Sequence, residues 1–198
     1  MAEVFSIDSK ISSSYIKIRD YLFEELQHVL KQGRCIVFLC IGTDRSTGDC
    51  LGPLIGYKLE FLSRDNIHIF GTLQNPIHSK NLVEKLDQIN LKFNNPYIIA
   101  IDACLGGINN IGKIFIEKKS LLPGIALNKN LPAVGQMSIT GIVNISGNFD
   151  FLVLQNTRLN TVMMISDIIS KGIYHFVLKS TTNNSHSKNH QVISFPSK

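Results

Sequence analysis

The sequence predicts an α/β protein, a three-layer α/β/α sandwich around a mostly parallel sheet. First, short and almost purely apolar runs recur along the 198 residues, as is typical of strands buried on both faces. Second, these runs alternate with segments whose apolar residues recur every three or four positions, the spacing of an amphipathic helix. Alternating strands and helices favour a parallel sheet with helices on both faces.

The first predicted element is a helix over residues 12–33, which ends at Gly33. Its apolar positions are Tyr15, Ile18, Leu22, Leu26 and Val29. A buried strand over residues 35–41 follows, and then a polar, glycine-containing loop over residues 42–52. Pro53 suits the first turn of the next helix.

The same pattern continues to residue 179. Strands are expected at residues 67–71, 97–101, 111–118, 136–145 and 173–179, with the strand at 111–118 nearer an edge. Helices are expected at residues 79–93 and 156–171, the second closed by Gly172. Residues 121–132 are rich in Gly, Pro and Asn and read as a loop.

Length and composition predict one domain over residues 1–179, with the N-terminal part, residues 1–33, packed on it as a helix. Residues 180–198 are rich in Ser, Asn, Lys and His and are interpreted as a polar C-terminal tail, either mobile or with a terminal strand around residues 192–195. A 44 % hydrophobic content is enough for a full core at this size.

The same features exclude several classes of protein. The net charge of +5 is partly an effect of the tail, and no basic stripe interleaved with aromatic residues is present, so no nucleic-acid partner is expected. No apolar run reaches the ~18 residues that cross a bilayer, and the N-terminus lacks the pattern of an export signal. The four cysteines form no CxxC pair and read as reduced thiols. We therefore expect a cytoplasmic protein without a membrane partner.

Two acidic residues follow predicted strands of this sheet. Ligands bind outside the carboxyl ends of parallel strands, where the strand order reverses. Asp102 follows the apolar run 97–101, and Asp49 lies in the loop after the run 35–41. If these two strands are neighbours, about 4.8 Å apart, the two carboxyl groups converge. One pKa then rises, and the pair can share a proton or hold a divalent cation, both of which point to hydrolysis.

Other residues in the three loops are weaker candidates. His78 ends the loop after the strand 67–71 and could reach the same crevice, and Arg45 could orient a carbonyl or an anionic group. The spacing of Gly42 and Gly48 resembles a phosphate cradle, but the Gly-Lys-Ser/Thr ending is missing. Cys50 and Cys104 lie near the acids without a paired base for a thiol nucleophile.

Several motifs resemble those of the YyaC family of sporulation proteins. They are residues 42–53 (GTDRSTGDCLGP), 71–78 (GTLQNPIH), 95–106 (NPYIIAIDACLG), 138–144 (SITGIVN) and 154–159 (LQNTRL), and the resemblance covers about residues 34–172. This family is similar to the spore germination protease and, more distantly, to the hydrogenase maturation endopeptidases. The resemblance implies the α/β/α fold of those endopeptidases, which is phosphorylase/hydrolase-like.

The resemblance also implies site residues. The two acids of the germination protease, an atypical aspartic peptidase, match Asp49 and Asp102. In the maturation endopeptidases the corresponding acids hold a metal with a histidine, for which His78 is the only plausible counterpart. Thr43 and Gly48 stand where the protease loop has Asn and Pro, and the chain has no evident pro-segment.

Three hypotheses follow. The first is an aspartate-dependent peptidase that needs no cofactor and acts on a protein or peptide substrate during sporulation. In it, Asp49 and Asp102 activate water and protonate the leaving amine, and backbone N–H groups near Gly106 and Gly107 stabilise the oxyanion. Gly42, Thr43, Arg45 and His78 bind or support the substrate. The second is a metal-dependent endopeptidase with Asp49, Asp102 and His78 as ligands. The third is a non-catalytic binding or scaffold protein on the same fold.

Overall fold

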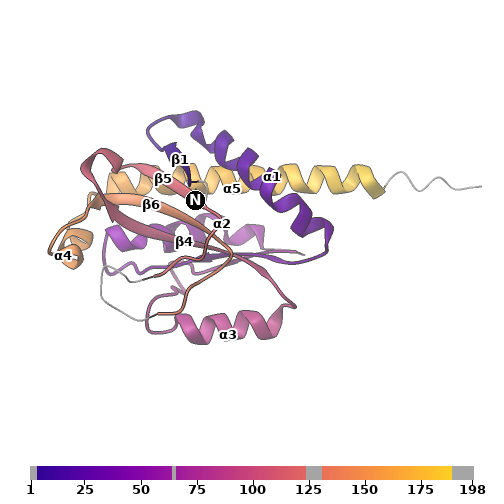
Figure 1. The fold of residues 1–198 in the computed structure, drawn as a ribbon, viewed down its shortest axis with the longest axis horizontal. Helices are drawn as coiled ribbons and strands as arrows, with labels where there is room; N and C mark the ends of the chain where they lie inside the picture. The colour runs from indigo at the N-terminus through magenta and orange to yellow at the C-terminus, as the bar shows by residue number, and fades with distance from the viewer. Residues whose placement is uncertain (1–3, 64–65, 124–130, 189–198) are drawn as a thin grey trace, which may run out of the picture.

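One mixed sheet organises the computed structural model, which describes residues 4–63, 66–123 and 131–188. Within these ranges the sheet has six strands in the order β1-β5-β6-β4-β2-β3 (Figure 1). The strands are β1 (Val4–Asp8), β2 (Ile36–Cys40), β3 (Ile67–Phe70), β4 (Tyr97–Gly106), β5 (Lys113–Glu117) and β6 (Met137–Ile145). The β3-β2-β4-β6 part is parallel, whereas β5 pairs antiparallel with both β6 and β1.

Helices cover both faces of this sheet, which confirms the predicted three layers. The helices are α1 (Tyr15–Lys31), α2 (Leu51–Leu59), α3 (Leu82–Lys92), α4 (Asp150–Gln155) and α5 (Leu159–Lys188). The apolar faces of α1, α2 and α5 share one core cluster, and α3 packs into a second cluster on the opposite face (Figure 1). Alternate residues of β2 enter the two clusters, with Phe38 in the first and Leu39 in the second. This explains why the whole run is apolar.

The order of the three central strands is as predicted. β2 lies between β3 and β4, and each pair is parallel. The chain first winds to one side of β2 and then crosses to the other, so the carboxyl end of β2 lies beside the middle of β4 at the point where the order reverses. That point is where a ligand is expected in an open α/β sheet.

Four predicted elements differ from the structure. The residues before α1 include the edge strand β1, so β5 lies second from that edge. β4 does not end at Asp102 but continues to Gly106, because β6 pairs with it along this whole length. The strand expected at residues 173–179 is wrong, since these residues belong to α5. Gly172 does not close a helix either, and α5 passes through it.

The C-terminal helix α5 is notable for its length and for an apolar stretch within it. It is helical through Lys188, so the first part of the expected tail is regular structure, while the strand considered around residues 192–195 lies outside the described residues. The stretch Leu159–Thr181 is long and apolar enough to cross a membrane by length and composition, but 56 % of the 18-residue apolar window within it is buried inside the fold. Buried core helices pass the same test, so this helix alone does not indicate a membrane protein.

Candidate functional site

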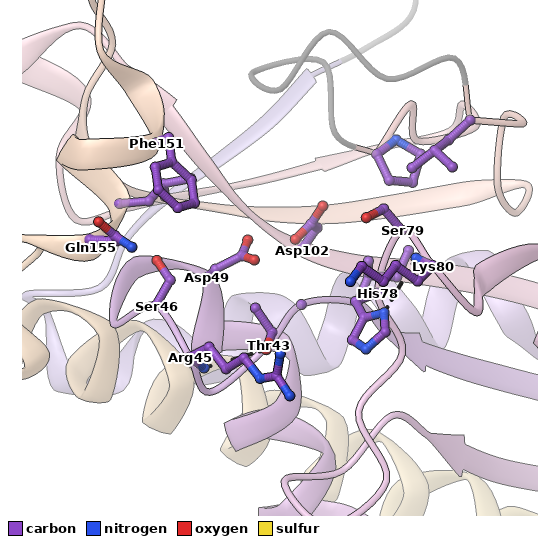
Figure 2. A pocket seen from close by; sticks show the side chains of 15 residues that line it. Thr43, Arg45, Ser46, Asp49, His78, Ser79, Lys80, Asp102, Phe151 and Gln155 are labelled. Carbon is purple, nitrogen blue, oxygen red and sulfur yellow. Dashed lines mark hydrogen bonds between the residues drawn. The ribbon is translucent and has the colours of Figure 1, made fainter.

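A pocket of about 500 Å³ lies at the carboxyl end of β2, beside the middle of β4 (Figure 2). Its walls come from the loop after β2, the loop before α3, β4, the segment around residue 123, and α4. The lining residues are Ile41, Gly42, Thr43, Arg45, Ser46, Asp49, His78, Ser79, Lys80, Asp102, Pro123, Leu131, Phe151, Leu154 and Gln155. The pocket therefore collects segments that are far apart in the sequence, and both predicted acids are among them.

Asp102 is the most deeply buried acidic group of this pocket, with 8 % of its surface exposed. It lies in the middle of β4, and its Oδ1 accepts a hydrogen bond from the backbone N–H of Ala103 at 2.8 Å. Burial raises the pKa of Asp102 well above its usual value, and the negative charge of Asp49 raises it further. The Ala103 N–H opposes this shift without cancelling it. Asp102 therefore retains a proton at a pH where an exposed aspartate has lost it.

Asp49 approaches Asp102 from the turn before α2. It is half-buried in the short 3-10 helix Gly48–Cys50, and Figure 2 shows its carboxyl group beside that of Asp102. Its backbone carbonyl accepts a hydrogen bond from the N–H of Thr43 at 3.0 Å. The N-terminus of α2 begins two residues later and places a partial positive charge near this carboxylate. Burial and the charge of Asp49 thus favour the protonated form of Asp102.

Close backbone packing fixes the position of Asp49. A Cβ on Gly42, whose φ is +139°, would lie 2.0 Å from the carbonyl oxygen of Asp49. A Cβ on Gly52 would lie 2.0 Å from the carbonyl oxygen of Ile41, at the end of β2. The glycines of the loop therefore allow α2 to lie directly against the strand end, which holds Asp49 over the sheet. Gly42 thus allows the close approach of this loop to Asp49.

The loop before α3 forms the opposite wall. The Asn81 side chain accepts a hydrogen bond from the His78 N–H at 2.9 Å and donates one to the Pro76 carbonyl at 3.0 Å, which fixes the loop. The Nδ1 of His78 accepts a bond from the N–H of Lys80 at 3.3 Å. In the neutral ring the hydrogen then resides on Nε2, which Figure 2 shows on the side of the ring away from the acids, so rotation of the ring is needed before His78 donates into the pocket. Figure 2 shows His78, Lys80 and Arg45 on one side of the acids.

The predicted metal site does not assemble from the residues present. Among the residues that the structure describes, no group of three or more His, Cys, Asp or Glu side chains could hold a metal ion. Asp49, Asp102 and His78 line one pocket, but they do not form such a group. Binding a metal through Nε2 of His78 would also require the tautomer that loses the bond from Lys80.

The predicted oxyanion donors are not at the pocket either. Gly106 and Gly107 were expected beside Asp102, but neither lines the pocket. The reason is the length of β4: at about 3.3 Å per residue, Gly106 lies roughly 13 Å along the strand from Asp102. The Gly106 carbonyl instead accepts a hydrogen bond from Ser146. By contrast, Gly42, Thr43, Arg45 and His78 all line the pocket as expected.

The nearby cysteines have raised thiol pKa values, mainly because they are buried. Burial raises the pKa of Cys50, and burial together with the charge of Asp102 raises that of Cys104 to about 12. A thiol is a good nucleophile only as the thiolate. Neither cysteine is therefore suited to covalent catalysis here.

One wall of the pocket was missed by the sequence reasoning. It consists of Phe151, Leu154 and Gln155 from α4, with Ser46 from the loop after β2 (Figure 2). A Cβ on Gly48 would lie 2.8 Å from Leu154 Cδ2, so α4 packs directly against the residue that precedes Asp49. No motif of α4 predicts this contact, because it depends on how the chain returns from β6.

Comparisons with known proteins place the chain in a family. Residues 6–172 match the family model described as "Protein of unknown function (DUF1256)". The chain is 47 % identical over 141 residues to a Bacillus subtilis (strain 168) protein described as "Uncharacterized protein YyaC", and the match covers 71 % of this chain and 69 % of that protein. A solved structure of a nickel-iron hydrogenase maturation protease, HycI from Thermococcus kodakarensis KOD1, is similar with a TM-score of 0.49 and 17 % identity. That match covers 78 % of this chain and 99 % of the other.

Proposed function

This chain belongs to the DUF1256 family, and we propose that it is an aspartate-dependent hydrolase that cleaves a peptide bond of a protein substrate. One observation carries the proposal. Asp102 is a buried carboxyl group that keeps its proton beside a second carboxyl group, Asp49, in a pocket at the carboxyl end of β2. A pair of carboxyl groups whose environments differ in this way can supply a base and an acid to one reaction.

The two aspartates take different roles. Asp49, half-buried at the N-terminus of α2, accepts a proton from a water molecule, and the oxygen of that water bonds to the carbonyl carbon of the substrate. Asp102 donates its proton to the amide nitrogen as the carbon–nitrogen bond breaks. One water is consumed, and a carboxyl and an amine terminus are formed. Transfer of the proton from Asp49 to Asp102 then restores the starting state.

Arg45 and His78 are placed to support this reaction. Both line the pocket on the same side of the acid pair (Figure 2). The guanidinium of Arg45 carries a fixed positive charge, and His78 presents a hydrogen-bond donor after rotation of its ring. We assign to them the stabilisation of negative charge on the substrate carbonyl oxygen, in place of Gly106 and Gly107. A role in sporulation rests on the motif resemblance and action in the cytoplasm on the sequence composition, and both belong to the proposal.

A second candidate function is a non-catalytic binding protein. The observation that favours it is an apolar rim of the α4 region, formed by Phe149, Phe151 and Leu152, which are exposed by 71 %, 53 % and 51 %, and of which Phe151 lines the pocket. Such a rim is typical of surfaces that recognise another protein. The metal-dependent alternative lacks a three-residue ligand group among the described residues, and we derive no step through a metal.

A cleavage screen separates these functions. The full chain is incubated with a broad peptide library, and products are identified by mass spectrometry. We expect cleavage by the wild type, and a loss of about 10²–10⁴-fold in Asp49→Asn and Asp102→Asn. Asp44→Asn is the matched control, because Asp44 is exposed in the same loop and does not line the pocket.

Each function predicts a different result. Undiminished cleavage by both aspartate variants would exclude the acid pair. Loss of cleavage on adding a chelator would favour the metal-dependent alternative. If the wild type cuts no peptide while a protein partner co-purifies with it, the binding function replaces the hydrolase.

A further inference from the structure

Ser46 carries a buried hydroxyl group that no step of the proposed reaction uses. The residue is 8 % exposed, and its Oγ, with less than 1 Å² of accessible surface, has no hydrogen-bond partner among the described residues. A buried hydroxyl without a partner is unfavourable, since it has lost its bonds to water. Ser46 also lines the pocket, so its partner is to be sought there.

The surroundings of Ser46 indicate what that partner is. Figure 2 shows its hydroxyl on the α4 side of Asp49, turned toward Gln155, with Phe151 above. Gln155 is an exposed amide, and Phe151 and Leu154 are apolar lining residues. The set combines a hydroxyl that both donates and accepts, an amide that does the same, and two apolar surfaces. Those groups match a peptide unit, which has an N–H, a C=O and a side chain.

The apolar rim of the α4 region is a second, independent observation. Phe149, Phe151 and Leu152 expose large apolar side chains within one short stretch. Phe151 belongs both to this stretch and to the pocket, so the rim continues into the site. A rim of this kind is unfavourable in water and is stabilised when a ligand covers it.

The position of this wall relative to the acid pair is fixed. Leu154 packs against Gly48, the residue before Asp49. At the same C-terminal end of α4, the Nδ2 of Asn144 donates hydrogen bonds to the carbonyl of Val153 and to the Oγ1 of Thr157, which tie this end to β6. A peptide unit held by this wall therefore lies next to the carboxyl group of Asp49.

We propose that Ser46, Gln155, Phe151 and Leu154 form a peptide-binding subsite that takes the substrate residue next to the scissile bond on the α4 side of the acids. The hydroxyl of Ser46 bonds to the main-chain amide of that residue, and Phe151 and Leu154 contact its apolar side chain. Gln155 turns aside to uncover the hydroxyl, a motion open to an exposed side chain on the picosecond to nanosecond scale. The inference rests on the proposed peptide substrate.

A binding measurement tests the subsite without requiring cleavage. The full-length ¹⁵N-labelled chain is titrated with N-acetyl-L-leucine N-methylamide, which is one leucine residue between two amide groups, and followed by NMR. We expect the largest shifts at the amides of Ser46, Phe151 and Gln155. In Ser46→Ala the affinity should fall about fivefold, the size expected for one hydrogen bond.

Ser170→Ala is the matched control. Ser170 also has a buried Oγ with no partner among the described residues, but it lies in α5 and does not line the pocket. We expect its affinity for the probe to equal that of the wild type. Both variants should keep or raise the melting temperature, because each removes an unpaired buried hydroxyl. A merely structural Ser46 would instead lower the melting temperature when replaced.

The possible outcomes separate this inference from the proposed function. Probe binding that needs Ser46, in a protein that cuts no peptide, would support the subsite and remove the hydrolase. Peptide cleavage that Ser46→Ala leaves unchanged in KM and kcat would keep the hydrolase and overturn the subsite. Probe shifts that avoid the α4 wall, or a lower melting temperature in Ser46→Ala with unchanged probe affinity, would also overturn it.

Discussion

The negative charge of Asp49 raises the pKa of Asp102, although one residue precedes α2 and the other lies within β4. This coupling arises because β2 and β4 are parallel neighbours and α2 packs closely on the end of β2. Burial is the larger cause of the shift, and the charge of Asp49 is the second. The two causes can be separated experimentally.

The stability of the wild type should depend on pH through Asp102. Below about pH 3.9, the usual aspartate pKa, the group is protonated in both the folded and the unfolded chain and contributes no difference. As the pH rises, the unfolded chain loses this proton while the folded chain keeps it. The free energy of unfolding therefore falls by about 1.4 kcal/mol per pH unit until the folded pKa is passed.

The free energy of unfolding of Asp102→Asn should not fall in this way, because asparagine does not titrate. Its side-chain oxygen can still accept the hydrogen bond from the N–H of Ala103. Urea unfolding between pH 4 and pH 8 should show that the free energy of unfolding of the variant increases relative to that of the wild type as the pH rises. Asp44→Asn controls for the loss of one negative charge in an exposed position. Parallel curves for Asp102→Asn and wild type would contradict the raised pKa.

Asp49→Asn should lower the pKa of Asp102 while leaving it above its usual value. The substitution removes the repulsion between the carboxylates but leaves Asp102 buried. The measurement is an NMR titration of the Asp102 side-chain carboxyl carbon in the wild type and in Asp49→Asn. An unchanged midpoint would show that the two groups are too far apart to interact.

Gly48→Ala should disturb the wall formed by α4. Its Cβ would lie 2.8 Å from Leu154 Cδ2 and 2.9 Å from the Oγ1 of Thr157, so α4 must move. We expect the free energy of unfolding to fall by about 1–2 kcal/mol and the amide signals of α4 to shift. Gly147→Ala is the control, because a Cβ there meets no atom within 4 Å. Equal stability and unchanged α4 signals in Gly48→Ala would refute the contact.

Gly52→Ala should be among the most damaging single-methyl changes. Its Cβ would lie 2.0 Å from the backbone oxygen of Ile41, which cannot give way without moving β2 or α2. A loss of about 3 kcal/mol in the free energy of unfolding is expected from urea denaturation. Gly107→Ala, where a Cβ has open space, should change stability by less than about 0.5 kcal/mol. Similar values for both variants would argue against the close packing of α2.

Missed elements show where local patterns are ambiguous. Residues 173–179 form a short, mostly apolar run that reads equally well as a strand. In the structure this run is helical, and its residues Ile173, Phe176 and Val177 are buried on the face that α5 turns toward the core. The sequence predicts that Gly172 ends a helix. It is needed inside α5 because a Cβ there would lie 2.6 Å from the side chain of Ile18 in α1. No feature of the sequence near Gly172 predicts this contact, because α1 is distant in the chain.

The sequence by itself determined the layered α/β architecture, the central strands and both acids, because buried strands and amphipathic helices leave periodic apolar patterns within one short segment. The tertiary structure decided everything that depends on segments distant in the chain: the continuation of β4 that removes Gly106 and Gly107 from the pocket, the wall of α4 against Gly48, and the unpaired hydroxyl of Ser46. Burial and close contact are properties of the folded chain. In the sequence Asp102 is only a polar residue after an apolar run, whereas in the fold burial and the nearby charge of Asp49 raise its pKa so that it holds its proton.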